Sequence, residues 1–462
     1  MQAILDLRLK DARLLIEKEK ALHPENGFAI YLEHYAESVE LIATEDERVY
    51  ERLINSYEDR MEKMDELDDG SPDNLWLQAE MLFQTGLAQV KFGTRINGVY
   101  KMLSSYERIK EHRKKYPDFW QNRKLTGVYN IILENIPPFL KWAADIFGFS
   151  GDAVLGLYQL EEYNKKAMAI PGLAEESVIM ANLGFLLARQ EEEAFKFMDV
   201  QDPELLKLTL AKYLYANSAS FVYRNDLTLK ALSEIDMDKL QVSFYALPYA
   251  IGRCKLNHLE MDARIFLEDF IYNYSVEDYK KAACNRLSYS YFLEGDLEKY
   301  QEYKEKVFTI GQSIRDRDQE AMLESSELIL PHKELLKARL LSDGGYFEDA
   351  MKIMKTIDPA KLSEKAYLLE YHYRMGRIFQ LKGNPEQAIP ELAKAFDEGR
   401  FDPYTFATRA ALNLGRIYED KKDYLVASSW FEKCIETYSS DHTTEGVKES
   451  AEKGVKRLRG KF

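Results

Sequence analysis

The sequence predicts an all-α fold in which antiparallel helical hairpins stack into a right-handed α-solenoid. Three observations support this prediction. Helical periodicity dominates the 462 residues, and strand-like alternation of apolar and polar residues is absent. Several prolines stand where helices are expected to begin. A pattern of small and aromatic residues also recurs at nearly constant spacing in the last third of the chain, which indicates repeated hairpins.

Five of the thirteen prolines follow a residue whose side chain can cap a helix. Proline suits the first position of a helix because its missing N–H would have no partner there. The pairs are Ser71-Pro72, Asp202-Pro203, Asp358-Pro359, Asn384-Pro385 and Asp402-Pro403. We therefore expect a helix to begin at each of these prolines.

The segment 371–400 shows the repeated unit most clearly. Gly376 on its first helix would let the second helix approach closely, and Phe379 would wedge beside the contact. The second helix carries an inward stripe of small and apolar residues: Ala388, Leu392 and Ala395. Such a hairpin buries one face of each helix only when further hairpins stack against it.

Two neighbouring units repeat this pattern. The following unit has Gly415, Tyr418, Ala427, Phe431 and Cys434 in the same roles. The preceding unit has Ala338, Leu341, Ala350 and Met354, with Gly344-Gly345 as the turn. The spacing is 39 residues from Gly376 to Gly415 and 38 from Ala350 to Ala388. Since the usual period is about 34 residues, we expect a longer connecting turn at 401–405.

The pattern weakens toward the amino terminus. A further hairpin is predicted from Gly252, Ala263, Leu267 and Phe270. Another at 282–307 has tyrosines where small residues are usual, and 73–109 and 174–234 are predicted as helical pairs without the glycine and alanine pattern. We therefore predict an atypical helical region at 1–150, irregular hairpins at 151–240 and repeats at 241–462, which are clearest at 332–440.

The three carboxy-terminal units resemble the tetratricopeptide-repeat superfamily. The segment Gly148-Phe149-Ser150-Gly151-Asp152, with Trp142 before it and Gly156-Leu157 after it, is similar to one branch of that superfamily. That branch contains proteins related to inclusion-body clearance and uncharacterised helical repeat proteins of Bacteroidetes. The resemblance implies an adaptor role with no known catalysis, and it transfers no particular partner.

Composition and motifs argue against most kinds of site chemistry. The chain has 63 basic and 78 acidic residues, and its net charge of −15 disfavours nucleic-acid binding. Cys254, Cys284 and Cys434 lie too far apart for a disulfide framework or a zinc site. The seven histidines lack metal-ligand spacing, and no phosphate-binding loop or nucleophile elbow occurs. We predict a protein that is not an enzyme and needs no cofactor or metal.

Arginine follows the small contact residue in four of the predicted units: Arg253, Arg339, Arg377 and Arg416. Four residues before each arginine stands an apolar or aromatic residue: Tyr249, Leu335, Tyr373 and Leu412. In a tetratricopeptide hairpin these positions face the concave groove, where guanidinium groups would grip the carboxylates of an acidic peptide. In the other interpretation, the arginines pair with Glu or Asp on neighbouring helices and only hold the array together. The sequence leaves both open.

We predict a scaffold or adaptor that binds a protein or peptide in this groove. The alternatives are an enzyme of unrecognised class, with a pocket near 142–152, and a component of an assembly at a membrane surface. No apolar run is long enough to span a bilayer. We therefore expect a soluble protein, in the cytoplasm by default, although the first residues would equally follow a removed export leader. The sequence does not fix the oligomeric state.

Overall fold

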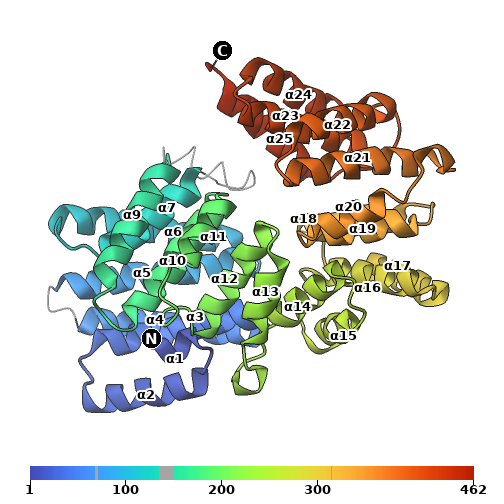
Figure 1. Ribbon diagram of the computed structural model, residues 1–462. Coiled ribbons are helices and arrows are strands. Elements are labelled where there is room, and N and C mark those ends of the chain that lie inside the picture. The colour runs from blue at the N-terminus through green and yellow to red at the C-terminus, as the bar shows by residue number, and fades with distance from the viewer. Residues whose placement is uncertain (68–70, 135–149, 314, 462) are drawn as a thin grey trace. The chain divides into compact units, whose positions relative to one another are not determined.

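The computed structural model describes residues 1–67, 71–134, 150–313 and 315–461, and within these ranges it contains helices and no strands (Figure 1). The predicted all-α fold of antiparallel hairpins is confirmed. The chain forms two compact units, Met1–Leu247 and Pro248–Phe462. Each unit has its own buried core, as expected for a chain of this length.

The first unit begins with long helices and continues with shorter ones. The longer helices are α2 (Leu9–Leu22), α3 (Gly27–Thr44), α4 (Glu47–Glu66), α5 (Pro72–Lys91) and α6 (Arg95–Lys115). The others are α1 (Gln2–Leu5), α7 (Asn122–Glu134), α9 (Ala153–Ala167), α10 (Leu173–Leu187), α11 (Glu191–Asp199), α12 (Thr209–Phe221), α13 (Asn225–Ser233) and the 3-10 helix η2 (Met237–Lys239). Successive helices pack against one another throughout the unit.

Glycines bring helices together in the first unit as well, including the pair predicted at 73–109 without the glycine and alanine pattern. A Cβ atom on Gly86 of α5 would lie 2.9 Å from the carbonyl oxygen of Gly98 on α6. A Cβ on Gly156 of α9 would lie 2.6 Å from that of Gly127 on α7. The helices α5 and α6 form the pair predicted there, and it differs from the repeat because both of its helices carry glycine at the contact, where the repeat sets glycine against a larger residue.

A buried ion cluster also holds the first unit together. Lys124 of α7 contacts Glu80 of α5 at 2.9 Å and Glu176 of α10 at 2.7 Å, and all three side chains are at most 4% exposed. The Tyr163 hydroxyl donates to the second oxygen of Glu176 at 2.9 Å. Burial alone would lower the pKa of Lys124, but the two carboxylates raise it above its ordinary value. The cluster links three helices by paired charges.

Much of the segment 142–152, where the alternative of an enzyme places a pocket, lies outside the described residues, including Trp142, Gly148 and Phe149. Two of its other residues have structural roles. Asp152 accepts a hydrogen bond from the N–H of Leu155 at 2.9 Å and caps α9. A Cβ on Gly151 would lie 2.2 Å from the backbone nitrogen of Glu134, so only glycine fits there.

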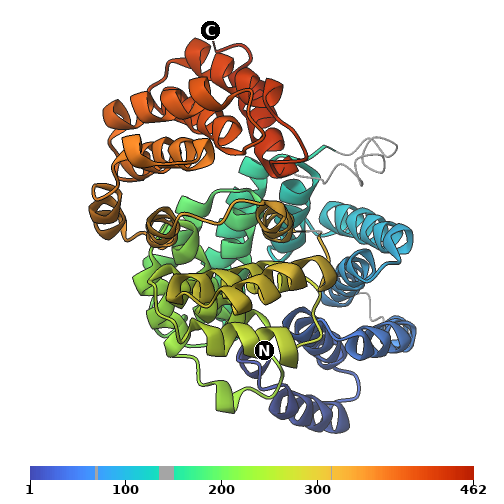
Figure 2. The same ribbon diagram turned by 90° about the vertical axis from the view of Figure 1, so that its right-hand side faces the viewer.

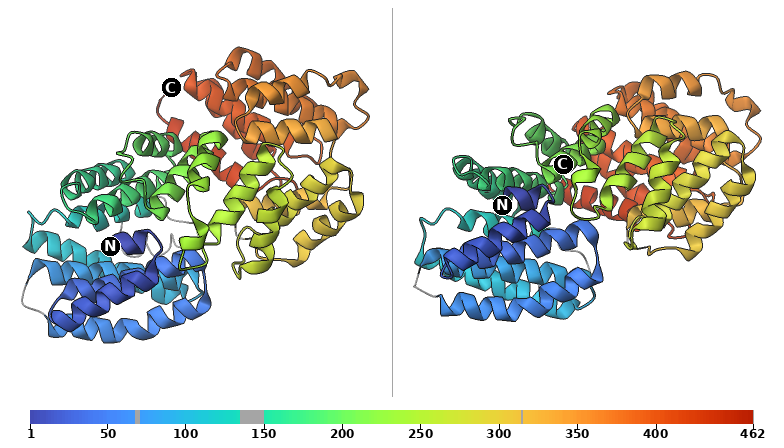
Figure 3. Two further views of the ribbon diagram at one scale, coloured as in Figure 1. Left: turned by 60° about the horizontal axis from the view of Figure 1, so that its bottom comes forward. Right: turned by 90° about the horizontal axis from the view of Figure 1, so that it is seen from below.

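The second unit consists of consecutive hairpins. Its helices are α14 (Ala246–Asn257), which begins at the boundary, α15 (Ala263–Asn273), α16 (Lys280–Glu294), α17 (Leu297–Thr309), α18 (Asp316–Ser326), α19 (Lys333–Asp343), α20 (Phe347–Met354), the 3-10 helix η3 (Pro359–Lys361), α21 (Lys365–Leu381), α22 (Pro385–Gly399), α23 (Phe406–Asp420), α24 (Tyr424–Glu436) and α25 (Glu445–Leu458). Figure 2 shows α21 to α25, in orange to red, packed side by side, and Figure 3 shows α16 and α17, in yellow, as a hairpin.

The small residues lie where the repeat pattern places them. A Cβ on Gly376 of α21 would lie 2.6 Å from Leu392 of α22, and a Cβ on Gly415 of α23 would lie 2.5 Å from the ring of Phe431 on α24. A Cβ on Gly454 of α25 would lie 2.7 Å from the same ring. Phe431, which is 1% exposed, is therefore enclosed by glycines of two helices. These contacts explain the recurring glycines.

Two of the five predicted helix starts are wrong. Pro72 and Pro385 occupy first turns of helices, and Pro359 begins the 3-10 helix η3. Pro203 and Pro403 instead lie in turns, and the next helices start at Thr209 and Phe406. The cap-and-proline signal is local and suits a turn equally well, because the Asp202 carboxylate accepts the N–H of Glu204 in the turn itself.

We expect Gly415→Ala to lower the free energy of unfolding by about 1–3 kcal/mol, because the added methyl group would overlap the enclosed Phe431 ring. Urea unfolding of the full chain, followed by circular dichroism, would measure the shift. Leu425→Ala on α24 is the control, since Leu425 is 65% exposed and should change stability by less than about 0.5 kcal/mol. Equal effects of the two substitutions would contradict the close contact.

Candidate functional site

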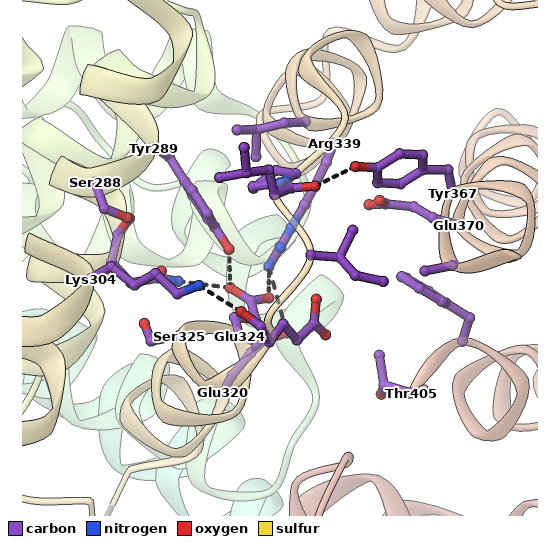
Figure 4. A pocket seen from close by; sticks show the side chains of 18 of the residues that line it. Ser288, Tyr289, Lys304, Glu320, Glu324, Ser325, Arg339, Tyr367, Glu370 and Thr405 are labelled. Atoms are coloured by element: carbon purple, nitrogen blue, oxygen red, sulfur yellow. Dashed lines mark hydrogen bonds and ion pairs between the residues drawn. The ribbon is translucent and has the colours of Figure 1, made fainter. Parts of the chain in front are cut away.

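A pocket in the second unit is lined mainly by the first helices of successive hairpins: α16, α19, α21 and α23. The helix α18, the connector 327–331 that follows it, and Tyr300 and Lys304 of α17 (Leu297–Thr309) also form part of the wall. We call this pocket the central groove (Figure 4). It is therefore partly occupied by a segment of the same chain.

The carboxylate of Glu324 is the most fully bonded group of α18. It accepts hydrogen bonds from the Tyr289 hydroxyl at 2.6 Å and from the Asn285 side-chain amide at 2.7 Å, both on α16. Its other oxygen contacts the guanidinium group of Arg339 on α19. Burial and the charge of Glu324 raise the pKa of Tyr289 well above its ordinary value, so this hydroxyl stays a donor. Figure 4 shows Tyr289 and Arg339 directed at this carboxylate.

Glu320 lies one helical turn earlier and reaches a second arginine. Its carboxylate contacts Arg409 of α23 at 2.9 Å and Arg339 at 3.7 Å. Burial by itself would raise the pKa of Glu320, but the charges of Arg409 and Arg339 outweigh it and lower the pKa to about 2. Glu320 is therefore ionised at neutral pH. Asn285, Tyr289, Arg339 and Arg409 together hold the two carboxylates, and we call these four residues the carboxylate seat.

The first turn of α18 is held in a different way. The Asp318 carboxylate accepts the backbone N–H groups of Tyr279 at 2.8 Å and Ala282 at 3.0 Å. These groups lie at the start of α16, so Asp318 caps that helix from another helix. Arg315 pairs with Asp278 at 2.8 Å beside it. The beginning of α18 is thus part of the framework of α16.

Contacts along the rest of α18 are mainly polar. Its fully buried residues are Asp318, Ala321 and Ser325. Beyond it, Lys304 donates to the carbonyl oxygen of Glu327 at 2.6 Å and the Tyr367 hydroxyl donates to that of Leu330 at 2.7 Å. Leu328, in the same connector, is 99% exposed. Little apolar burial holds the carboxyl end of α18 in the groove.

The structure places some of the predicted groove residues here and others elsewhere. Arg339 belongs to the carboxylate seat, and Tyr373 lines the groove beside Phe406, with 5.9 Å between ring centres. Tyr249 lines a smaller pocket next to it that also contains Arg339. Both tyrosines are largely buried within the chain, and Tyr249 stacks on Tyr279.

The other three predicted arginines are not among the described residues that line the groove. Arg253 and Arg377 are half-buried, and Arg377 donates to the side-chain oxygen of Gln380 at 2.8 Å. Arg416 is exposed. The structure therefore joins one of the four predicted arginines to carboxylates from α18, and the role of the other three stays a prediction.

Sequence reasoning missed Asn285, Tyr289 and Arg409. The first two belong to the hairpin at 282–307, where Tyr289 follows Ser288 as Arg339 follows Ala338. Arg409 lies six residues before Gly415, at a position that was not compared between units. The signal for α18 was the long interval between that hairpin and the next, which leaves room for an additional helix.

No other arrangement of a known site type stands out in the described part of the chain. It contains no cluster of His, Cys, Asp or Glu suited to a metal ion. Within the same residues, the three cysteines are buried and form no disulfide. Among the same residues, no helix is both long and apolar enough to cross a membrane.

Comparison with protein families identifies the last hairpin. A family model described as tetratricopeptide repeat matches residues 408–441, which correspond to α23, α24 and the turn after them. This segment is a tetratricopeptide repeat, and the preceding hairpins share its small-residue contacts. A search of curated proteins finds no match.

A search of solved structures lists chains that are similar to this one over most of their length. The tetratricopeptide domain of P58(IPK) has 16% identity and a TM-score of 0.23, covering 89% of this chain and 98% of that one. Yeast Tom70 has 11% identity and a TM-score of 0.34, covering 99% and 86%. The Cut9–Hcn1 hetero-tetramer of the APC/C gives 10% identity and a TM-score of 0.26, covering 99% and 94%.

We expect Glu320→Gln to lower the free energy of unfolding at pH 7 by about 1–3 kcal/mol, a value between those of exposed and buried ion pairs. The pKa of Glu320 is lowered from 4.5 to about 2 in the folded protein. Its ionised form therefore contributes stability above about pH 4.5, and this contribution is lost as the pH falls toward 2. The difference between wild type and variant should shrink over the same range.

Urea unfolding at pH 7, 5 and 3 would measure this difference. Glu302→Gln is the control, because Glu302 forms an exposed pair with Lys299 on α17. Glu302→Gln should change the free energy of unfolding little at any of the three pH values. A difference for Glu320→Gln that stays constant from pH 7 to pH 3 would show that its charge does not stabilise the groove.

Proposed function

We propose that this protein is a non-enzymatic scaffold that binds a protein or peptide in the central groove of its second unit. The support comes from one observation: side chains from three hairpins, on α16, α19 and α23, converge on the carboxylates of one helical segment. A surface of this kind suits recognition of a side-chain pattern on another segment. The tetratricopeptide repeat at 408–441 agrees with such a role.

The residues that we propose for binding include the predicted repeat positions. Arg339 and Tyr373 lie in the groove. Arg377 and Arg416 stand at the position equivalent to Arg339 in the next two units. Arg253 stands at the equivalent position of an earlier unit, and Tyr249 precedes it by four residues. We propose that these residues extend the binding surface along the array, beyond the part that α18 occupies.

The carboxylate seat and the two carboxylates that it holds suit binding better than catalysis. The carboxylates of Glu320 and Glu324 are each paired with arginine, so neither stands ready as a general base. Tyr289 is held neutral, and the cysteines are buried with raised pKa values. Binding needs only the complementary charges that are already present.

We expect Arg377→Glu combined with Arg416→Glu to reduce partner capture at least tenfold, because the added carboxylates would repel an acidic partner. The experiment immobilises the full chain, exposes it to lysate of the cells that produce it and quantifies the retained proteins by mass spectrometry. Melting should stay unchanged. Lys352→Glu combined with Lys361→Glu is the matched control, since it alters net charge equally at two exposed lysines.

An equal loss of partner capture in both double variants would show that capture depends on net charge and not on Arg377 and Arg416. Unfolding of the first double variant alone would show that the two arginines hold the array together. Either result would remove Arg377 and Arg416 from the proposed surface.

A further inference from the structure

We propose that the partner of the central groove is an acidic helix, which carries two carboxylates four residues apart and takes the places of Glu320 and Glu324. This inference rests on the proposed function and names the chemistry of the partner. Residues four apart lie on the same face of a helix. The carboxylate seat matches that spacing, since Arg339 bridges both positions while Arg409 reaches the first.

The charge of the groove favours an anionic occupant. Outside α18 and the connector 327–331, its lining contains four basic residues, Lys304, Arg339, Arg374 and Arg409, and one acidic residue, Glu370. Guanidinium groups that are mostly removed from water are costly unless they are paired. An empty seat is therefore unfavourable, and an incoming helix must bring carboxylates to replace those of α18.

The geometry also favours a helix over an extended peptide. Asn285 and Tyr289 lie one turn apart on α16 and donate to the same oxygen of Glu324. Arg409 holds the carboxylate one turn earlier from a different hairpin. In an extended strand, side chains on one face recur every second residue. Residues two apart would then stand about 7 Å from each other, close to the about 6 Å between residues four apart on a helix. The preference for a helix therefore rests on the helical form of α18, which fills the seat, and not on the spacing alone.

The carboxyl half of α18 can leave the seat without unfolding the framework. Asp318 holds the first turn of α18 on α16, and Arg315 pairs with Asp278 beside it. Beyond this turn, Ala321 is the one fully buried apolar residue of the helix. After Ser326 the chain continues into a connector whose Leu328 is exposed. We infer that α18 frays from Ser326 back to Glu320 and uncovers the seat, while Asp318 stays in place.

A labelled synthetic peptide of residues 315–330 is the probe for this inference. We expect it to bind the full-length variant Glu320→Gln/Glu324→Gln at least tenfold more tightly than wild type, because the resident helix of the variant lacks both charges. The same peptide with glutamine at both positions should bind the variant at least tenfold more weakly. Adding Arg409→Gln to the variant should also weaken binding. Fluorescence anisotropy measures all four pairs.

Two results would overturn the inference. One is a folded double variant that binds the acidic peptide no better than wild type does. The other is equal binding of the acidic and the glutamine peptide. If either occurs while Arg377→Glu combined with Arg416→Glu still reduces partner capture, the proposed scaffold function stands and only the acidic helix is excluded.

Hydrogen exchange on the wild type keeps the inference testable if the double variant does not fold. We expect amides of residues 321–326 to exchange at least tenfold faster than those of 284–293 in α16, because fraying exposes the former alone. Equal protection of the two segments would show that α18 is fixed in the groove, and the inference would then be wrong.

Discussion

The close approach of paired helices at small residues determines the rest of the second unit. Glycine at positions 376 and 415 lets the second helix of each hairpin lie against the first without room for a Cβ atom. This contact fixes the rotation of the first helix about its axis. Residues that follow the contact, such as Arg339 after Ala338, then face away from the partner helix. Arg339 enters the carboxylate seat from this position, whereas Arg409 reaches it from another position on α23.

Much of the fold can be predicted from local sequence, since each hairpin carries its own pattern. The spacing of 38 to 39 residues, the turn at 401–405 and the Gly344-Gly345 turn all agree with the helix bounds. Helix starts at Pro203 and Pro403 were wrong because the same residue pair also begins a turn. Local signals identify a chain reversal more reliably than they identify the structure that follows it.

The groove could be predicted only in part. Arg339 was found because it recurs at a repeat position, but its partners come from α18, which has no apolar stripe and no repeat pattern. Arg409 and Glu320 are 89 residues apart, and no local rule connects two such positions. Contacts between an array and an additional helix depend on how hairpins stack, which short patterns do not encode.

The two units use paired charges in different surroundings. Lys124, Glu80 and Glu176 are enclosed, so their desolvation is compensated by one another and by the Tyr163 hydroxyl on Glu176. The side chains of Arg409 and Glu320 keep 24% and 32% of their exposure and lie in a pocket. Fully buried ion pairs such as those of Lys124 specify how helices pack. Partly exposed pairs such as that of Arg409 and Glu320 can exchange one carboxylate for another at much lower cost.

Because α18 is joined to the array at both ends, it competes for the carboxylate seat as a tethered ligand. Short tethers of this kind correspond to effective concentrations on the order of millimolar. A free helix of equal intrinsic affinity would therefore occupy few grooves at micromolar concentration. Occupancy would require additional contacts outside the seat or several linked helices in one partner. The tether thus sets a minimum affinity or concentration that a partner must reach to displace α18. Valency and local concentration would therefore distinguish partners more than charge alone does.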